Sequence, residues 1–251
     1  MKKLFATKFD WRFILEQFLT EKLPQGSRRT WAKRRMGLSS DHPLYKGRYL
    51  HPNTSYFDKP AGITQVFFLV DASGSMGVRC PDGVDIFEHI MSEMIQIELA
   101  VNIETSAFAT FNTGAIHRDN IFEWTSDDAS DESSLLDELK NKIPVAGGGT
   151  SAIDGIRSIQ QYDDVYSTQD PWTLLVVITD GGDNYNGLKD ICKDYEQVEH
   201  MIWIITATGE EWFNSKKTEL MEQGVPEERI LFVDINREWG CTEDMVKAHN
   251  K

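Results

Sequence analysis

The chain has 251 residues, of which 40% are hydrophobic and 26% are charged, a composition typical of a globular protein with one substantial core. Its net charge of −14 is divided unevenly, since residues 1–60 carry a net charge of +8 and residues 61–251 a net charge of −22, which argues against nucleic-acid binding through the acidic body. No run of about 18 apolar residues is present, so we expect no membrane span and no membrane partner.

The N-terminal part of the chain combines a predicted amphipathic helix with a basic arm. Residues 10–22 place apolar side chains at helical spacing, and Pro24 and Gly26 end the predicted helix. Residues 25–62 show no sustained periodicity, so we expect an irregular arm that wraps over the domain. The aromatic residues expected to anchor this arm are Trp31, Tyr45, Tyr49, Tyr56 and Phe57. The basic stretch 27–35 either packs on an acidic surface, of this domain or of a partner, or binds phosphate groups.

From residue 63 onward, predicted strands alternate with predicted helices. Apolar runs predict strands at 63–70, 106–112, 115–124, 172–179, 201–208 and 229–235. Helical periodicity predicts helices at 85–101, 131–143, 151–162, 188–198, 210–223 and 242–249. The second and third strands are expected to form a hairpin through a turn at 112–114. The alternation predicts a doubly wound α/β fold, with a mostly parallel sheet flanked by helices and one antiparallel edge strand.

The spacing of the three cysteines bears on whether they pair and on the cellular compartment of the protein. Cys80, Cys192 and Cys241 lie far apart in the sequence and form no CxxC pair. This pattern argues against a disulfide framework and against a zinc site, and it is typical of a reducing compartment. The first residues include two lysines, but Lys8 and Asp10 leave the apolar stretch too short for a signal peptide. We therefore expect a cytoplasmic protein.

Three loops that carry glycine and oxygen-bearing side chains adjoin the predicted strands and helices. Residues 71–75 (DASGS) follow the first strand, residues 147–151 (GGGTS) precede a helix, and residues 179–183 (TDGGD) end another strand. In open α/β sheets, ligands bind beyond the carboxyl ends of the strands. Hydroxyls and carboxylates are hard donors that suit Mg²⁺ or Mn²⁺, and Ca²⁺ less well. Each loop alone is compatible with a turn, a cap or a phosphate loop, but their coincidence favours a metal site.

The order and spacing of these loops are similar to those of the metal-ion-dependent adhesion site of von Willebrand factor type A domains. The residues that carry the resemblance are Asp71, Ser73, Ser75, Thr150 and Asp180, in the pattern DxSxS, then T, then D. The resemblance covers about residues 62–250, and it implies such a domain over 62–251, preceded by the N-terminal helix and basic arm over 1–61. The chain also resembles stand-alone bacterial and phage proteins of this family.

The resemblance implies a role for each of the five residues. Ser73, Ser75 and Thr150 would bind the metal through their hydroxyl oxygens, directly or through water. Asp71 and Asp180 would hold waters and orient the hydroxyls. Because few carboxylates would bind the ion directly, it would remain strongly electrophilic and keep one coordination place open for a ligand from outside.

An open coordination place implies a docking site rather than a catalytic centre. In this family the outside ligand is a Glu or Asp of a partner protein, and the residues expected at its contact are Gly74, Gly149 and Asp183.

The resemblance implies a metal-dependent adaptor of a MoxR-type AAA+ ATPase. A structural or assembly component, for example of a phage, that uses the same face is the alternative, and nucleic-acid binding through the basic arm is the third interpretation. The tryptophans that could extend the docking face are Trp124, Trp172, Trp203, Trp212 and Trp239.

Ser75 also lies in a stretch similar to a nucleophile elbow, which would indicate a serine hydrolase. An elbow requires glycine where Ser73 stands, and it requires a helix directly after the nucleophile, which the following VRCPDGVD does not predict. The histidines His89, His200 and His249 are poorly placed for a triad. We therefore expect no enzyme activity.

Overall fold

The computed structural model describes residues 11–22, 65–101, 103, 105–125, 132–142, 149–162, 173–192 and 201–249. The predicted basic arm with its aromatic anchors, together with Gly147, Gly148 and Trp172, lies outside the described residues. No helix in the described ranges is long and apolar enough to cross a bilayer.

The described strands form one six-stranded sheet at the centre of the molecule. They are β1 (Gln65–Asp71), β2 (Thr105–Phe111), β3 (Phe122–Thr125), β4 (Thr173–Thr179), β5 (Met201–Ala207) and β6 (Ile230–Asp234). Their order across the sheet is β3-β2-β1-β4-β5-β6. All neighbours pair in parallel except β2 and β3. The predicted doubly wound α/β fold with one antiparallel edge strand is therefore confirmed, and it is consistent with a von Willebrand factor type A-like architecture.

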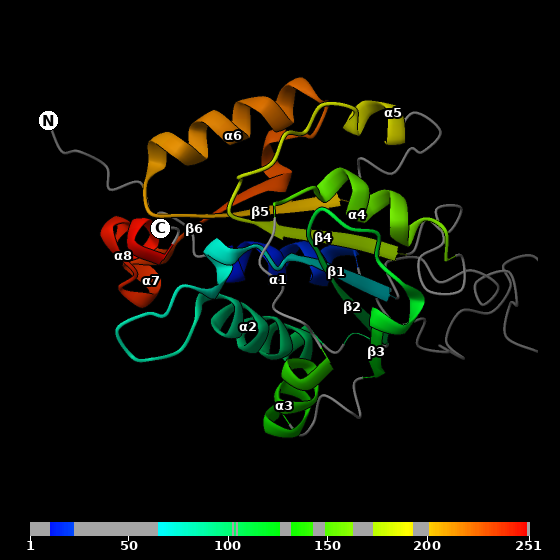
Figure 1. Ribbon diagram of the computed structural model, residues 1–251. Helices are drawn as coiled ribbons and strands as arrows, with labels where there is room; N and C mark the ends of the chain where they lie inside the picture. Colours follow the sequence, from blue (N-terminus) through cyan, green and yellow to red (C-terminus); the bar gives the residue numbers. More distant parts are fainter. Residues whose placement is uncertain are drawn as a thin grey trace, which may run out of the picture.

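Helices cover both faces of this sheet (Figure 1). One layer contains α4 (Ala152–Ile159), α5 (Leu188–Cys192) and α6 (Glu210–Glu222). The other contains α1 (Trp11–Lys22), α2 (Ile86–Val101), α3 (Glu132–Lys142), α7 (Ile235–Trp239) and α8 (Glu243–His249). Each layer has its own buried apolar cluster against the sheet.

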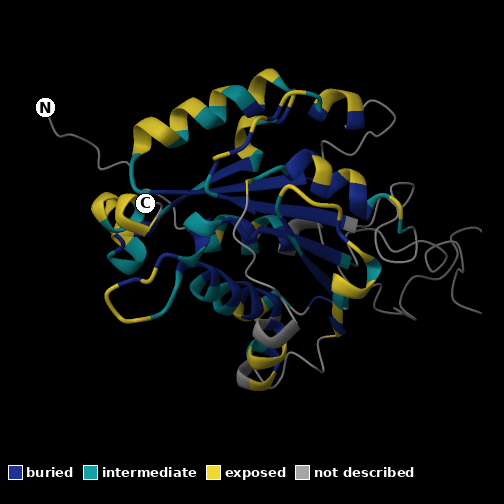
Figure 2. Cartoon of the chain, in the orientation of Figure 1, coloured by how far each residue is buried: buried dark blue, intermediate teal, exposed yellow. Residues whose placement is uncertain are grey.

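The continuous apolar run of β1 follows from this three-layer arrangement. Along the strand, Val66 and Phe68 pack in the cluster beside α1 and α2, whereas Phe67 and Leu69 pack in the cluster beside α4 and α6. Successive side chains of a strand point to opposite faces, so a strand covered on both faces needs an apolar residue at every position. Figure 2 shows the central strands buried and the outer faces of the helices exposed.

Helix α1 packs into the core of the domain that follows it in the sequence. Leu15 and Leu19 are fully buried in the cluster beside α2. The Arg12 guanidinium donates a 2.6 Å hydrogen bond to the Glu93 carboxylate on α2 and a 2.9 Å hydrogen bond to the Glu238 carboxylate on α7. The helix that the sequence assigns to the N-terminal extension therefore joins α2 and α7 on one face of the sheet.

The prediction of a strand over residues 115–124 is wrong in its first part. Only Phe122–Thr125 is strand, and a 3-10 helix occupies Arg118–Asn120. Ile116 and Ile121 are both buried in the cluster beside α4. Residues five apart point to opposite faces of a regular strand, so both can reach the same cluster only if the strand is interrupted.

The prediction that the cysteines do not pair is also wrong. Cys80 and Cys241 form a disulfide, although they are separated by 161 positions in the sequence. The fold brings the loop after β1 next to the chain that follows α7, a short helix that the sequence did not predict. Separation in sequence carries no information about this proximity, which depends on the strand order. The inference of a reducing compartment relied on unpaired cysteines, and the disulfide removes that support.

Candidate metal centre

The candidate site lies where the direction of the chain reverses across the sheet. Strands β1 and β4 are neighbours, but the chain continues from β1 to β2 on one side and from β4 to β5 on the other. The chain therefore leaves the carboxyl ends of these two strands in opposite directions across the sheet. Such a topological switch point is where open α/β sheets bind their ligands. Both loops contain residues of the predicted metal site.

The loop after β1 is folded around the buried carboxylate of Asp71. The Oδ1 atom of Asp71 accepts a 2.7 Å hydrogen bond from the Ser73 backbone N–H. The backbone N–H of Met76 donates to the Ser73 carbonyl at 3.0 Å, within a 3-10 helix over Gly74–Gly77. This turn places the hydroxyl oxygens of Ser73 and Ser75 3.0 Å apart. The DxSxS spacing thus brings two hydroxyls together above one buried acid.

The loop after β4 is hydrogen-bonded to the loop after β1. The Thr179 hydroxyl donates to Oδ2 of Asp71 at 2.9 Å and accepts from the Gly181 backbone N–H at 3.1 Å. The Ser75 hydroxyl donates to Oδ2 of Asp180. The structure therefore brings Ser73, Ser75 and Asp180 into one hydrogen-bonded group, with Asp71 beneath it.

Thr150 lies at the same edge of the sheet, at the start of α4. The Asp183 carboxylate accepts hydrogen bonds from the backbone N–H groups of Ala152 and Asn184, the latter at 2.6 Å. These bonds tie the start of α4, two residues after Thr150, to the loop that carries Asp180. Within the part of the chain that the structure describes, Thr150 makes no hydrogen bond with Ser73, Ser75 or Asp180.

The three residues expected to contact a partner lie in different environments. A Cβ atom at Gly74 would meet no atom within 4 Å, so the space beside this glycine is open. A Cβ atom at Gly149 would lie 3.0 Å from Cγ2 of Thr113, in the loop after β2. Asp183 is only 7% exposed, and both of its carboxylate oxygens accept backbone hydrogen bonds, so its side chain faces the protein interior.

Two acids at this edge of the sheet, Asp71 and Asp183, are buried. Burial, together with the negative charge of Asp180, raises the pKa of Asp71 to about 6. Burial also raises the pKa of Asp183. Keeping Asp71 ionised is costly without a nearby positive charge, and a divalent cation would lower that cost.

The donors fit a hard divalent cation. In an octahedron with metal–oxygen bonds of about 2.1 Å, adjacent oxygen ligands are about 3.0 Å apart. The Ser73 and Ser75 hydroxyls have this separation. No group of three or more His, Cys, Asp or Glu side chains that could hold a metal occurs among the described residues. The fit therefore depends on hydroxyl oxygens, which favour Mg²⁺ or Mn²⁺ over softer ions.

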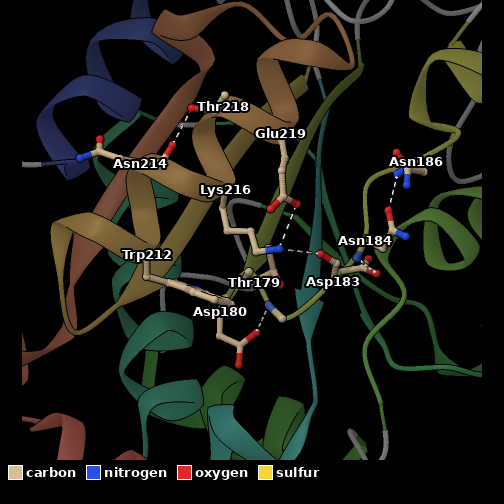
Figure 3. A network of polar contacts seen from close by, with 12 residues as sticks. Thr179, Asp180, Asp183, Asn184, Asn186, Trp212, Asn214, Lys216, Thr218 and Glu219 are labelled. Atoms are coloured by element: carbon tan, nitrogen blue, oxygen red, sulfur yellow. Dashed lines mark hydrogen bonds and ion pairs between the residues drawn. The ribbon is translucent and has the colours of Figure 1, made fainter.

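Two side chains of α6 support the loop after β4 (Figure 3). The Trp212 indole N–H donates a 2.7 Å hydrogen bond to the Asp180 carbonyl, and the Lys216 ammonium donates to the Asp183 carbonyl at 3.2 Å. The φ angle of Gly181 is +77°, and a Cβ atom there would lie 2.9 Å from Cγ of Lys216. The sequence indicated Trp212 only as one of five tryptophans that could extend the docking face, and it did not indicate Lys216. The glycine at position 181 was the available sign of a close contact.

No protein-family model matches the sequence, and no curated protein matches it. Among solved structures, the chain is similar to the conserved hypothetical protein BatB from Bacteroides thetaiotaomicron, with 15% identity and a TM-score of 0.44 over 75% of this chain and 99% of that one. It is also similar to the pilus adhesin RrgA from Streptococcus pneumoniae, with 14% identity and a TM-score of 0.29 over 47% of this chain and 20% of the adhesin. At these values neither similarity bears on function, and the fold class follows from the strand order.

Proposed function

We propose that this protein binds Mg²⁺ or Mn²⁺ at the carboxyl ends of β1 and β4 and uses the ion to dock an acidic residue of a partner protein. The observation that carries the proposal is the 3.0 Å separation of the Ser73 and Ser75 hydroxyl oxygens, beside Asp180 and above the buried Asp71. Neutral hydroxyl donors leave most of the positive charge of the ion uncompensated.

Each residue of the group has a distinct role in this proposal. Ser73, Ser75 and Thr150 supply hydroxyl oxygens to the ion. Asp71 holds the loop after β1 through its bond to the Ser73 backbone, and Asp180 orients the Ser75 hydroxyl. A bound divalent cation supplies a Lewis-acidic point that attracts a carboxylate. The protein thus acts as a binding module and not as an enzyme.

The resemblance to von Willebrand factor type A domains points to a class of partner, a MoxR-type AAA+ ATPase that the protein serves as an adaptor. An assembly component of a larger complex would use the same face in the same way. The two differ in the partner that the metal-dependent contact retains.

The metal site is tested by thermal unfolding of the full chain with and without the ion. Mg²⁺ at about 100 times its dissociation constant should raise Tm by about 5–10 °C, because binding to the folded state alone stabilises it. The double variant Ser73→Ala, Thr150→Ala should abolish this rise. The matched control Ser215→Ala, Thr218→Ala removes one serine and one threonine hydroxyl from exposed positions of α6 and should keep it. An undiminished rise in the first variant would contradict the assignment.

The partner class is tested by affinity capture with Mg²⁺ and with EDTA. Recovery of a AAA+ ATPase in Mg²⁺ alone supports the adaptor function, and recovery of a capsid, tail or filament protein supports the assembly function. Proteins retained equally well by the Ser73→Ala, Thr150→Ala variant do not use the metal, and their predominance would contradict the proposal.

A further inference from the structure

Two side chains of α6 hold the loop that carries Asp180, although this helix carries none of the five predicted metal-site residues. The Trp212 indole N–H donates to the Asp180 carbonyl at 2.7 Å, and the Lys216 ammonium donates to the Asp183 carbonyl at 3.2 Å. Trp212 and Lys216 are four positions apart, so they are neighbours on one face of the helix. Figure 3 shows both side chains extending from α6 to the loop. One helix face therefore holds the loop backbone at two points.

The Lys216 ammonium is enclosed by further contacts. It lies 5.1 Å from the centroid of the Trp212 ring and 5.7 Å from that of the Tyr185 ring. It also pairs with the Glu219 carboxylate at 2.9 Å, and only 12% of its side chain is exposed. A lysine side chain is flexible when it is free in solvent, but these contacts restrict it to one position. Its hydrogen bond to the Asp183 carbonyl therefore has a defined direction.

The segment between the two supported carbonyls is Gly181-Gly182. Gly181 has a φ angle of +77°, and a Cβ atom there would lie 2.9 Å from Cγ of Lys216 and 3.1 Å from the indole nitrogen of Trp212. Glycine loses more conformational freedom on folding than any other residue, so ordering two in succession is costly. The contacts with α6 offset this cost, and the glycine at position 181 leaves room for them.

The carboxylates on either side of this segment connect it to the rest of the site. The Asp180 carboxylate accepts a hydrogen bond from the Ser75 hydroxyl, and the Asp183 carboxylate accepts one from the Ala152 backbone N–H. A shift of the loop would move Asp180 relative to Ser75 and would loosen the start of α4, next to Thr150. Loss of groups that orient metal ligands typically weakens metal binding 10–100-fold.

We propose that Trp212 and Lys216 are positioning residues of the metal centre, which set its affinity for the ion by holding the loop of Asp180 in place. This inference rests on the proposed function, and it deepens it by placing control of the site in a helix that supplies no ligand. Each side chain acts through a backbone carbonyl of the loop and not on the ion. Trp212 is 48% exposed, so its replacement should leave the fold intact.

The first test is Mn²⁺ binding to the full chain, followed by the electron paramagnetic resonance signal of the free ion while circular dichroism shows each variant to be folded. Trp212→Phe keeps an aromatic ring without the N–H donor, and Lys216→Met keeps the length of the side chain without the ammonium. Each should weaken binding about tenfold. The matched control is Lys217→Met, which removes an ion pair with Glu227 and a ring contact with Phe213, both outside the loop, and should leave binding unchanged.

A second pair of variants tests the same contact from the side of the loop. Gly181→Ala adds a Cβ atom that requires both α6 side chains to shift, and it should also weaken Mn²⁺ binding about tenfold. Gly83→Ala imposes a similar backbone strain, since the φ angle of Gly83 is +90°, but its Cβ atom would meet no atom within 4 Å. This control should bind Mn²⁺ as the unmodified chain does.

Amide hydrogen exchange in EDTA tests the positioning without the ion. The backbone N–H groups of Gly181 and Gly182 both donate to side chains of their own loop. Their exchange should be several times faster in Trp212→Phe and in Lys216→Met than in the unmodified chain, because the loop opens more often, and Lys217→Met should not change it.

Unchanged Mn²⁺ affinity or unchanged amide exchange in Trp212→Phe or in Lys216→Met would overturn the positioning role of that residue and leave the metal site standing. An unmodified chain that binds no Mn²⁺ would overturn the proposed function, and the inference with it. Binding that persists in the Ser73→Ala, Thr150→Ala variant would have the same consequence.

Discussion

At the scale of single residues, Asp71 carries a high electrostatic cost at the candidate metal centre. Its side chain is fully buried, and it accepts hydrogen bonds from the Ser73 backbone and from the Thr179 hydroxyl. These bonds lower its pKa, but burial and the charge of Asp180 outweigh them. Asp71 thus combines a structural role, holding two loops together, with a charge that the metal-free protein accommodates poorly.

This cost predicts a pH dependence of stability for the metal-free protein. The pKa of Asp71 rises from 3.8 to about 6 on folding, so the folded state binds its proton more tightly than the unfolded state does. The stabilising contribution of this proton is complete below about pH 4 and is lost as the pH rises through about 6. The loss amounts to about 3 kcal/mol. Asp71→Asn has no carboxyl group at this position and should not show this loss of stability. The free energy of unfolding of the variant, minus that of the unmodified chain, should therefore increase from pH 4 to pH 7.

The measurement for Asp71 is urea unfolding in EDTA across this pH range. A constant difference between the two proteins would contradict the expected pKa. In saturating Mg²⁺ the unmodified chain should regain the lost stability at neutral pH, because the cation stabilises the ionised carboxylate.

At the scale of elements, α4 lies unusually close to the sheet. A Cβ atom at Gly155 would lie 2.8 Å from Cβ of Phe111 on β2 and 3.5 Å from Cδ2 of Leu69 on β1. The start of the same helix is tied to the loop after β4 through Asp183. Close packing in the middle of the helix and a hydrogen bond at its start together place Thr150 at the edge of the candidate site.

Gly155→Ala should therefore affect both stability and metal binding. The added methyl group overlaps Phe111, and we expect a loss of about 1–3 kcal/mol in the free energy of unfolding, partly offset by the better helix propensity of alanine. Displacement of α4 should also reduce the Mg²⁺-dependent rise in Tm. Arg157→Ala is the matched control, since this side chain is exposed on the same helix and its substitution should change stability by less than about 0.5 kcal/mol. Equal effects of the two substitutions would argue against the close approach.

At the scale of the whole molecule, the Cys80–Cys241 disulfide joins the segment after the first strand, β1, to the segment after the last strand, β6. It connects the loop after β1 to the residue that follows Gly240 at the end of α7. The rings of His89 on α2 and Trp239 on α7 also stack, with centroids 5.0 Å apart. The C-terminal helices are thus attached, by a covalent bond and by ring packing, to the segment that follows the metal loop.

Reduction of this disulfide should lower stability by about 2–4 kcal/mol, because a bond that closes a loop of 161 residues restricts the unfolded chain. Urea unfolding with and without dithiothreitol measures the change. Cys241→Ser should lower stability by a similar amount and remove the response to dithiothreitol, whereas Cys192→Ser should retain the response. Thiol titration of the unfolded, unreduced chain should find one reactive cysteine, and three would contradict the pairing.

Much of the fold and part of the candidate site could be predicted from the sequence because their signals are local. Apolar runs such as that of β1 predicted the strands. The alternation of these runs with segments of helical periodicity predicted the α/β class. The DxSxS spacing placed Ser73 and Ser75 within one turn, where their hydroxyls meet. Asp180 follows a parallel strand, and the carboxyl ends of neighbouring parallel strands share one edge.

Other features were determined only by the tertiary structure. The pairing of Cys80 with Cys241 and the contact of Trp212 with Asp180 join segments whose separation in sequence says nothing about their proximity. The inward direction of Asp183 depends on where α4 begins relative to β4. The sequence by itself determined the central strands, the longer helices and the chemical groups that end the strands, since these depend on neighbouring residues. Only the order β3-β2-β1-β4-β5-β6 decided which of those groups meet, because contacts across the sheet depend on long-range packing.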